Sequence, residues 1–129
     1  MKYKIEQLTG NNLRYFNVRN DKNEYIGWVG IEISDMPHYA FKEYCNEQPD
    51  RCAKIVYVKT NKSYRNQGVA TEVLNKVVKE YEDWDLFLQV IPLDSNNTVA
   101  TLTKFYEKFG FKRCESGGSI PTMVKPAKL

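Results

Sequence analysis

The pattern of apolar and polar positions predicts that the first half of the chain is built from strands. Residues 13–19 and 24–33 are rich in aromatic and β-branched side chains and flank a polar turn at residues 20–23, which is the signal of a β-hairpin. Residues 2–8 alternate weakly and predict a further strand. Residues 53–60 form a nearly continuous apolar run, which is typical of a central, buried strand.

In the second half of the chain, the spacing of the apolar residues predicts helices. Apolar residues recur every three to four positions over residues 68–82 and predict an amphipathic helix. Residues 85–91 predict another strand, ended by Pro92. A second helix follows, with polar residues 94–97 as its expected cap and Gly110 as its expected left-handed stop. Its apolar face consists of Val99, Leu102, Phe105, Tyr106 and Phe109.

The remaining segments complete an α+β pattern. Residues 36–51, which contain two prolines, predict a short helix, and residues 111–114 and 120–124 predict two closing strands. The order of elements predicts a mixed, mostly antiparallel central sheet with one strand–helix–strand unit at its centre. Because the sequence shows no repeat and no linker, we expect residues 1–129 to form a single domain.

Composition narrows the class of protein. The chain has 129 residues, of which 42% are hydrophobic and 27% charged, as in ordinary globular proteins. It is too short for a barrel enzyme of about 250 residues. Its net charge of +3 comes from 19 basic and 16 acidic residues spread evenly along the chain, so charge gives little support for nucleic-acid binding.

Other features suggest a cytoplasmic protein. The first residues, MKYKIEQ, carry no apolar run, and no apolar stretch is long enough to span a membrane. Three cysteines are an odd number, which favours free thiols in a reducing compartment. No cysteine or histidine pair has zinc-site spacing, so we expect no metal.

The turn between the strand at residues 53–60 and the first predicted helix is the most informative segment. It reads Arg65-Asn66-Gln67-Gly68-Val69-Ala70. The first amides of a helix have no acceptor within it, and the helix dipole favours negative charge there. A glycine at this position lets an anion approach the backbone closely, so the turn predicts an anion site. It lacks the Gly-Lys-Ser/Thr ending of a P-loop.

This turn resembles the pyrophosphate motif of the Gcn5-related N-acetyltransferases (the GNAT family), Gln/Arg-x-x-Gly-x-Gly/Ala. Downstream, Asn97, Ala100 and the run Phe105 to Phe111 resemble the second cofactor motif of the family, Asn…Ala…Tyr-x-Lys-x-Gly-Phe. The resemblance covers about residues 53–115, which would form the cofactor half of a GNAT-like, acyl-CoA-binding domain.

The resemblance implies transfer of an acetyl group from acetyl-coenzyme A, as cosubstrate, to a primary amine of a small molecule or protein by direct attack. It implies that the pyrophosphate lies on the amides of residues 67–71, with Arg65 as a counter-charge, and that the pantetheine arm pairs with residues 57–59. The implied cofactor-binding residues are Tyr57, Val58, Lys59, Arg65, Gln67, Gly68, Val69, Ala70, Thr71 and Asn97.

The resemblance also implies catalytic roles. The amide of Val58 would donate to the thioester oxygen, and Tyr106 would be the general acid that protonates the departing thiolate. Tyr106 also lies on the apolar face of its helix, so a packing role stays open. Asn97 is equally suited to capping that helix.

Two expectations concern the acceptor side. The family usually has two helices between its first two strands, whereas only three to five residues separate those strands here, so the first helices are reduced or missing. No carboxylate stands at the start of the central strand. Glu32, Asp50 and His38 are therefore candidates for the general base, beside a water relay.

Two other function classes remain open. One is a non-catalytic coenzyme A-binding or protein-interaction module of the same fold. The other is a nucleic-acid-binding domain that uses exposed aromatic residues on the sheet, namely Tyr15, Phe16, Tyr25 and Trp28. An open sheet edge makes a homodimer a further expectation.

Overall fold

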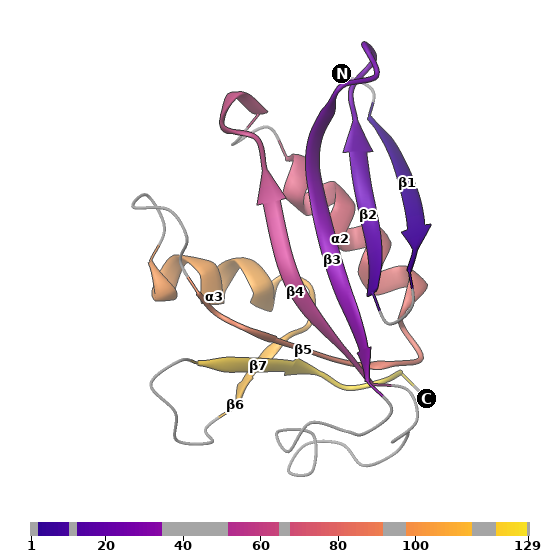
Figure 1. Cartoon of the computed structure of the whole chain (residues 1–129). Helices are drawn as coiled ribbons and strands as arrows, with labels where there is room; N and C mark the ends of the chain where they lie inside the picture. Colours follow the sequence, from indigo (N-terminus) through magenta and orange to yellow (C-terminus); the bar gives the residue numbers. More distant parts are fainter. Residues whose placement is uncertain are drawn as a thin grey trace.

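A mixed sheet organises the chain (Figure 1). The computed structural model describes residues 3–10, 13–34, 52–64, 68–91, 98–114 and 121–128. In these residues, seven strands form one sheet in the order β1-β2-β3-β4-β5-β7-β6. The strands are β1 (Lys4–Thr9), β2 (Leu13–Arg19), β3 (Tyr25–Ser34), β4 (Cys52–Thr60), β5 (Asp85–Gln89), β6 (Lys112–Cys114) and β7 (Thr122–Lys125). The helices are η1 (Lys62–Tyr64), α2 (Val69–Glu80) and α3 (Val99–Glu107).

Strands β1 to β4 form an antiparallel meander, and β4 pairs with β5 in parallel. The predicted α+β class, the mixed sheet and the hairpin of β2 and β3 are confirmed. Only residues 10–12 separate β1 from β2, so the chain has no room for helices there. The prediction that the two helices between the first two strands are reduced or missing is therefore confirmed. The helix expected at residues 36–51 lies outside the described residues.

The predicted cap of α3 is wrong. The helix begins after Thr98, and not within residues 94–97. The Thr98 side chain accepts a hydrogen bond from the Thr101 N–H (3.1 Å), and the Thr101 side chain accepts one from the Thr98 N–H (2.9 Å). This reciprocal pair satisfies two amides at once, which explains why the helix starts here. At the other end, Gly110 has a φ of +95°, as predicted for a left-handed stop.

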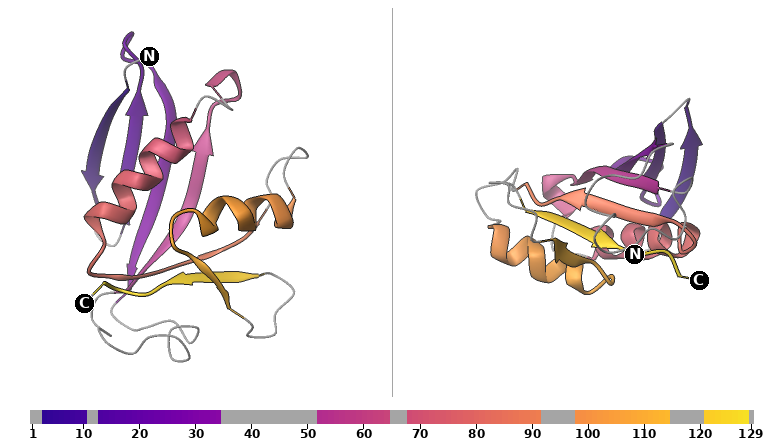
Figure 2. Two further views of the ribbon diagram at one scale, coloured as in Figure 1. Left: turned by 180° about the vertical axis from the view of Figure 1, so that it is seen from behind. Right: turned by 90° about the horizontal axis from the view of Figure 1, so that it is seen from below.

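The main core lies between the sheet and α2, which crosses one face of β2, β3 and β4 (Figure 2). We call this the inner face. Side chains of α3 belong to the same core. Phe16 points into it and is fully buried, so the expectation that it is an exposed aromatic is wrong. The reason is strand alternation, because Phe16 and the buried Val18 share the inner face of β2.

Gly27 fixes how closely α2 approaches the sheet. A Cβ atom at this position would lie 2.9 Å from the Lys59 carbonyl oxygen and 3.4 Å from a methyl group of Val69. Val69 is the first residue of α2 and is buried. The absence of a side chain at Gly27 therefore lets the start of α2 and the end of β4 meet over β3.

We predict that Gly27→Ala lowers the free energy of unfolding by about 1–3 kcal/mol, because backbone atoms of β4 have to move to admit the methyl group. Chemical denaturation checks the value. Gly10→Ala is the control, since among the described residues a Cβ atom there would meet only the Leu13 carbonyl oxygen, at 3.3 Å. An equal loss in both variants would contradict the close approach at Gly27.

Candidate functional site

Strands β4 and β5 run side by side for four residue pairs, from Cys52 with Asp85 to Ile55 with Leu88. At this point β4 contains a bulge, because Gly30 pairs with Tyr57 and Ile31 pairs with Ile55, which leaves Val56 unmatched. A bulge bends and twists its strand. Beyond the bulge, β4 and β5 separate (Figure 1).

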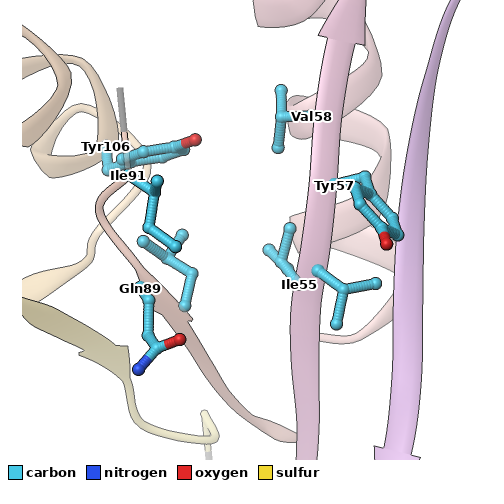
Figure 3. A pocket seen from close by; sticks show the side chains of 8 residues that line it. Ile55, Tyr57, Val58, Gln89, Ile91 and Tyr106 are labelled. Carbon is cyan, nitrogen blue, oxygen red and sulfur yellow. The ribbon is translucent and has the colours of Figure 1, made fainter. Parts of the chain in front are cut away.

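A pocket of about 160 Å³ lies in this opening (Figure 3). It is smaller than the roughly 300–1,000 Å³ of a pocket that encloses a whole drug-sized ligand, so it can enclose one end of a longer ligand. The lining residues are Ile55, Val56, Tyr57, Val58, Leu88, Gln89, Ile91 and Tyr106.

The backbone of Val58 faces the opening. The N–H of Asn61 donates to the carbonyl oxygen of Ile26 on the β3 side, at 2.8 Å. In an antiparallel pair the backbone groups alternate between the partner strand and the opposite side. Counting back from Asn61 in the observed register, Lys59 and Tyr57 direct their backbone groups toward β3, and Val58 directs its own away from it. A hydrogen-bond donor therefore stands on the β4 wall of the pocket.

Tyr106 forms the opposite wall. Its side chain is 8% exposed and packs edge-on against Phe105 and Phe111, with ring centroids 5.4 and 6.2 Å away. The hydroxyl group points across the opening toward β4 (Figure 3). Burial raises the pKa of Tyr106 to about 12, because the ionised phenolate is poorly solvated there. The Tyr106 ring is therefore packed, as its position on the apolar face of the helix suggested, and its hydroxyl group is at the pocket, where a proton donor would have to be.

The start of α2 is suited to an anion. Gly68 precedes the helix with a φ of +80°, a left-handed conformation that favours glycine, and it provides no side-chain cap. The first bond of the helix runs from the Glu72 N–H to the Gly68 carbonyl, so the amides of residues 69–71 are not used within α2. A Cβ atom at Gly68 would meet nothing within 4 Å among the described residues, so the space beside this glycine is open.

The other predicted site residues divide into two groups. Tyr57, Lys59 and Glu32 lie on the face of the sheet opposite α2, which we call the outer face. Glu32 is exposed there and lies opposite Lys54 of β4. The second group lies outside the described residues and comprises Arg65, Gln67, Asn97, Asp50 and His38.

Sequence reasoning missed the β5 side of the pocket. Gln89 and Ile91 line it, and Ile91 is an exposed large apolar side chain. Their signal was the end of an apolar strand that follows a strand–helix unit, because the carboxyl ends of neighbouring parallel strands are common ligand sites. The bulge that opens the pocket has no comparable sequence signal.

In the part of the chain that the structure describes, no group of three or more His, Cys, Asp or Glu side chains could hold a metal ion. Neither described α-helix has the length and apolar character needed to cross a bilayer.

Comparison with known structures shows that this chain has a fold found in acetyltransferases. Histone acetyltransferase HPA2 and related acetyltransferase from Corynebacterium glutamicum aligns with a TM-score of 0.65 and 17% identity, over 92% of this chain and 66% of that chain. The PaiA N-acetyltransferase from Thermoplasma acidophilum, in complex with coenzyme A, aligns with a TM-score of 0.60 and 17% identity, over 88% of this chain and 60% of that chain. Arabidopsis thaliana NAA60, in complex with a bisubstrate analogue, gives a TM-score of 0.63 and 16% identity, over 90% and 77%.

The chain thus spans less than two thirds of the length of the first two structures. A search of curated protein sequences found no significant match. The model of the acetyltransferase (GNAT) family, however, matches residues 1–111, which is most of the chain. Together with the open pair of central strands and the glycine before α2, this match shows that the chain belongs to the GNAT acetyltransferase family.

Proposed function

We propose that this protein transfers an acetyl group from acetyl-coenzyme A to a primary amine by direct attack. The observation that carries the proposal is the opening between β4 and β5, which has the Val58 amide on one wall and the Tyr106 hydroxyl on the other. A donor for a developing oxyanion and a donor for a leaving group are the two groups that acyl transfer from a thioester requires.

The proposed binding mode uses the inner face. The pyrophosphate would lie on the amides of residues 69–71, beside Gly68, where the backbone is open to an anion. The pantetheine arm would run along the free side of β4 and pair with Val58. Three residues outside the described part keep their proposed roles: Arg65 as a counter-charge, Gln67 as an amide donor and Asn97 as a contact. The PaiA enzyme, which has the same fold, forms a complex with coenzyme A, and this supports coenzyme A as the ligand of the fold.

Val58 is proposed to stabilise charge on the reacting carbonyl. Acetyl-coenzyme A, when bound, supplies a thioester whose carbonyl carbon can be attacked by an amine. The N–H of Val58 would donate to the carbonyl oxygen as negative charge develops there. In other enzymes, loss of one such donor costs about 10²–10³ in rate.

Tyr106 is proposed to protonate the leaving group. The new C–N bond forms as the C–S bond breaks, and the Tyr106 hydroxyl gives its proton to the departing sulfur. The nitrogen releases its surplus proton to solvent, and Tyr106 regains a proton from solvent. With a pKa of about 12, the phenol is protonated at every pH at which the chain would work. The ammonium must lose its own proton before attack. Glu32, on the outer face, is our candidate base, with His38, Asp50 and a water relay as the alternatives.

We also infer that the chain works in the cytoplasm, since three cysteines in a chain of this size are typical of a reducing compartment.

We predict that acetyl-coenzyme A and coenzyme A stabilise the folded chain. Saturation to 100 times the dissociation constant raises the free energy of unfolding by about 2.7 kcal/mol, which thermal unfolding detects. Gly68→Asn tests the site, because asparagine tolerates a positive φ but its side chain fills the open space. The variant folds and shows a smaller ligand shift, whereas Glu80→Asn, at the far end of α2, keeps the full shift. No shift at millimolar ligand would contradict both the enzyme and the non-catalytic binding module.

We predict that Tyr106→Phe lowers kcat by about 10²–10⁴, because the ring still packs but the proton donor is gone. Release of coenzyme A thiol in the presence of an amine measures the rate. The ligand-induced shift in thermal unfolding is the control and stays unchanged. Turnover near the wild-type rate would contradict the role of Tyr106. Ligand binding without turnover of any amine in the wild type would favour the binding module.

The pH dependence of stability checks independently that the phenol is buried in the folded chain. The folded chain keeps the Tyr106 proton up to about pH 12, whereas the unfolded chain loses it near pH 10. The stability that this residue contributes is therefore present below pH 10 and is lost as the pH rises toward 12, on the order of 2–3 kcal/mol. Phenylalanine cannot ionise, so the stability of the wild type falls relative to Tyr106→Phe over this range. A constant difference would contradict the burial.

A further inference from the structure

A cluster of aromatic rings lies on the outer face of the sheet, next to the pocket. We call Tyr15, Trp28 and Tyr57 the aromatic shelf. The Trp28 ring lies 6.0 Å from that of Tyr15 and 5.1 Å from that of Tyr57, measured between centroids. The three side chains come from β2, β3 and β4 and share the face of the sheet that α2 does not cover. No described helix crosses this face of β1 to β4 (Figures 1 and 2).

Gly30 makes the shelf compact. It pairs with Tyr15 on one side and with Tyr57 on the other. A Cβ atom at Gly30 would lie 3.2 Å from the Tyr57 ring and 3.6 Å from the Tyr15 ring, so both rings rest against this glycine. The Tyr57 ring accordingly leans over β3, away from the pocket interior (Figure 3).

Stability of the core does not explain the shelf. The main core is on the inner face, and Tyr57 remains 51% exposed. Tyr15 and Trp28 are half-buried beside it. Aromatic rings that cluster on a partly exposed face commonly mark a binding surface. Tyr57 also lines the pocket and immediately precedes Val58, whose amide would hold the reacting carbonyl. The shelf is therefore continuous with the reaction centre and reaches it from the face opposite the proposed pyrophosphate site.

The charged residues around the shelf restrict the charge of the ligand that it can bind. Among the described residues of this face, Glu6 and Arg19 form an ion pair at 2.9 Å. Lys54, Lys59 and the single acid Glu32 are the charged residues on the same face of β3 and β4. A basic surrounding disfavours a ligand with several positive charges. One carboxylate beside a cluster of aromatic rings suits a single ammonium group carried on a planar apolar body.

We propose that the aromatic shelf binds the acceptor, and that the acceptor is a primary amine carried on an aromatic group. The proposal rests on the proposed function, because it identifies the substrate class of that reaction. The planar body stacks on Trp28 and contacts the tilted ring of Tyr15, and the amine extends past Tyr57 toward the carbonyl held by Val58. The amine then attacks as described above, and Glu32 takes its first proton.

The test compares two amines of similar size and charge. 2-Phenylethylamine has a planar ring, and 2-cyclohexylethylamine has a puckered one that cannot stack. We expect the wild type to show a kcat/KM about tenfold higher for the phenyl compound. Trp28→Leu and Tyr15→Leu remove this preference and leave the acetyl-coenzyme A shift in thermal unfolding unchanged. Tyr25→Leu is the control, because Tyr25 is an exposed aromatic residue of the same sheet that lies against Arg19 and outside the shelf, and this variant keeps the preference.

The outcomes separate the two proposals. Equal kcat/KM for both amines, or a preference that survives Trp28→Leu and Tyr15→Leu, overturns the aromatic shelf and leaves the proposed function intact. A shelf buried between two copies in solution, detected as a dimer that both variants dissociate, also overturns it. If acetyl-coenzyme A binds but neither amine nor any other is acetylated, the proposed function fails, and the acceptor proposal fails with it.

Discussion

The parallel hydrogen bonds between β4 and β5 stop after Ile55 and Leu88, and the candidate site depends on that interruption. Backbone groups away from water need hydrogen-bond partners, and a strand beyond the end of its ladder directs half of its groups to an open side. The bulge at Val56 produces this condition in the middle of the sheet, where pairing would otherwise continue. The result is a short stretch of β4 whose backbone groups face an open side, as they would at the edge of a sheet. This stretch nevertheless lies within the sheet, between β3 and β5.

The two helices place the remaining groups around this edge. The start of α2 is held close to β3 and β4 because Gly27 has no side chain, and Gly68 keeps the first amides of the helix accessible. The capping box of Thr98 and Thr101 fixes the start of α3, and the buried rings around Tyr106 fix its side chain. Each wall of the pocket is thus positioned by packing that lies outside the pocket. The sheet then separates the two proposed ligands, with the cofactor on the α2 side and the acceptor on the aromatic side.

Much of this arrangement could be predicted from the sequence, for physical reasons. Two segments rich in aromatic and β-branched residues around a polar turn predicted the hairpin of β2 and β3, and the spacing of apolar residues predicted α2 and α3. Gly68 and Gly110 were correctly placed next to helix ends because positive φ angles favour glycine. The position of Tyr106 at a pocket could be expected only from the resemblance to a family, since its helix face alone also fits simple packing.

The missed features depend on tertiary context. Thr98 caps α3 although the four polar residues before it, 94–97, are equally good caps by type, and the choice depends on Thr101 one turn later. Phe16 cannot be distinguished from Tyr15 by composition, because which of two neighbouring residues faces α2 depends on strand register. The sequence next to Val56 contains no turn residue that would predict the bulge. The pairing of Tyr15 and Tyr57 across Gly30 likewise follows from the register of three strands.

Hydrogen exchange at the Val58 amide, followed by NMR, tests the central claim most directly. In the free chain, Tyr57 and Lys59 donate toward β3 and should be protected, whereas Val58 faces the opening and should exchange rapidly. Addition of acetyl-coenzyme A should slow exchange at Val58 and leave its two neighbours nearly unchanged. Protection of Val58 in the free chain, or exchange at Val58 that saturating acetyl-coenzyme A does not alter, would contradict the account.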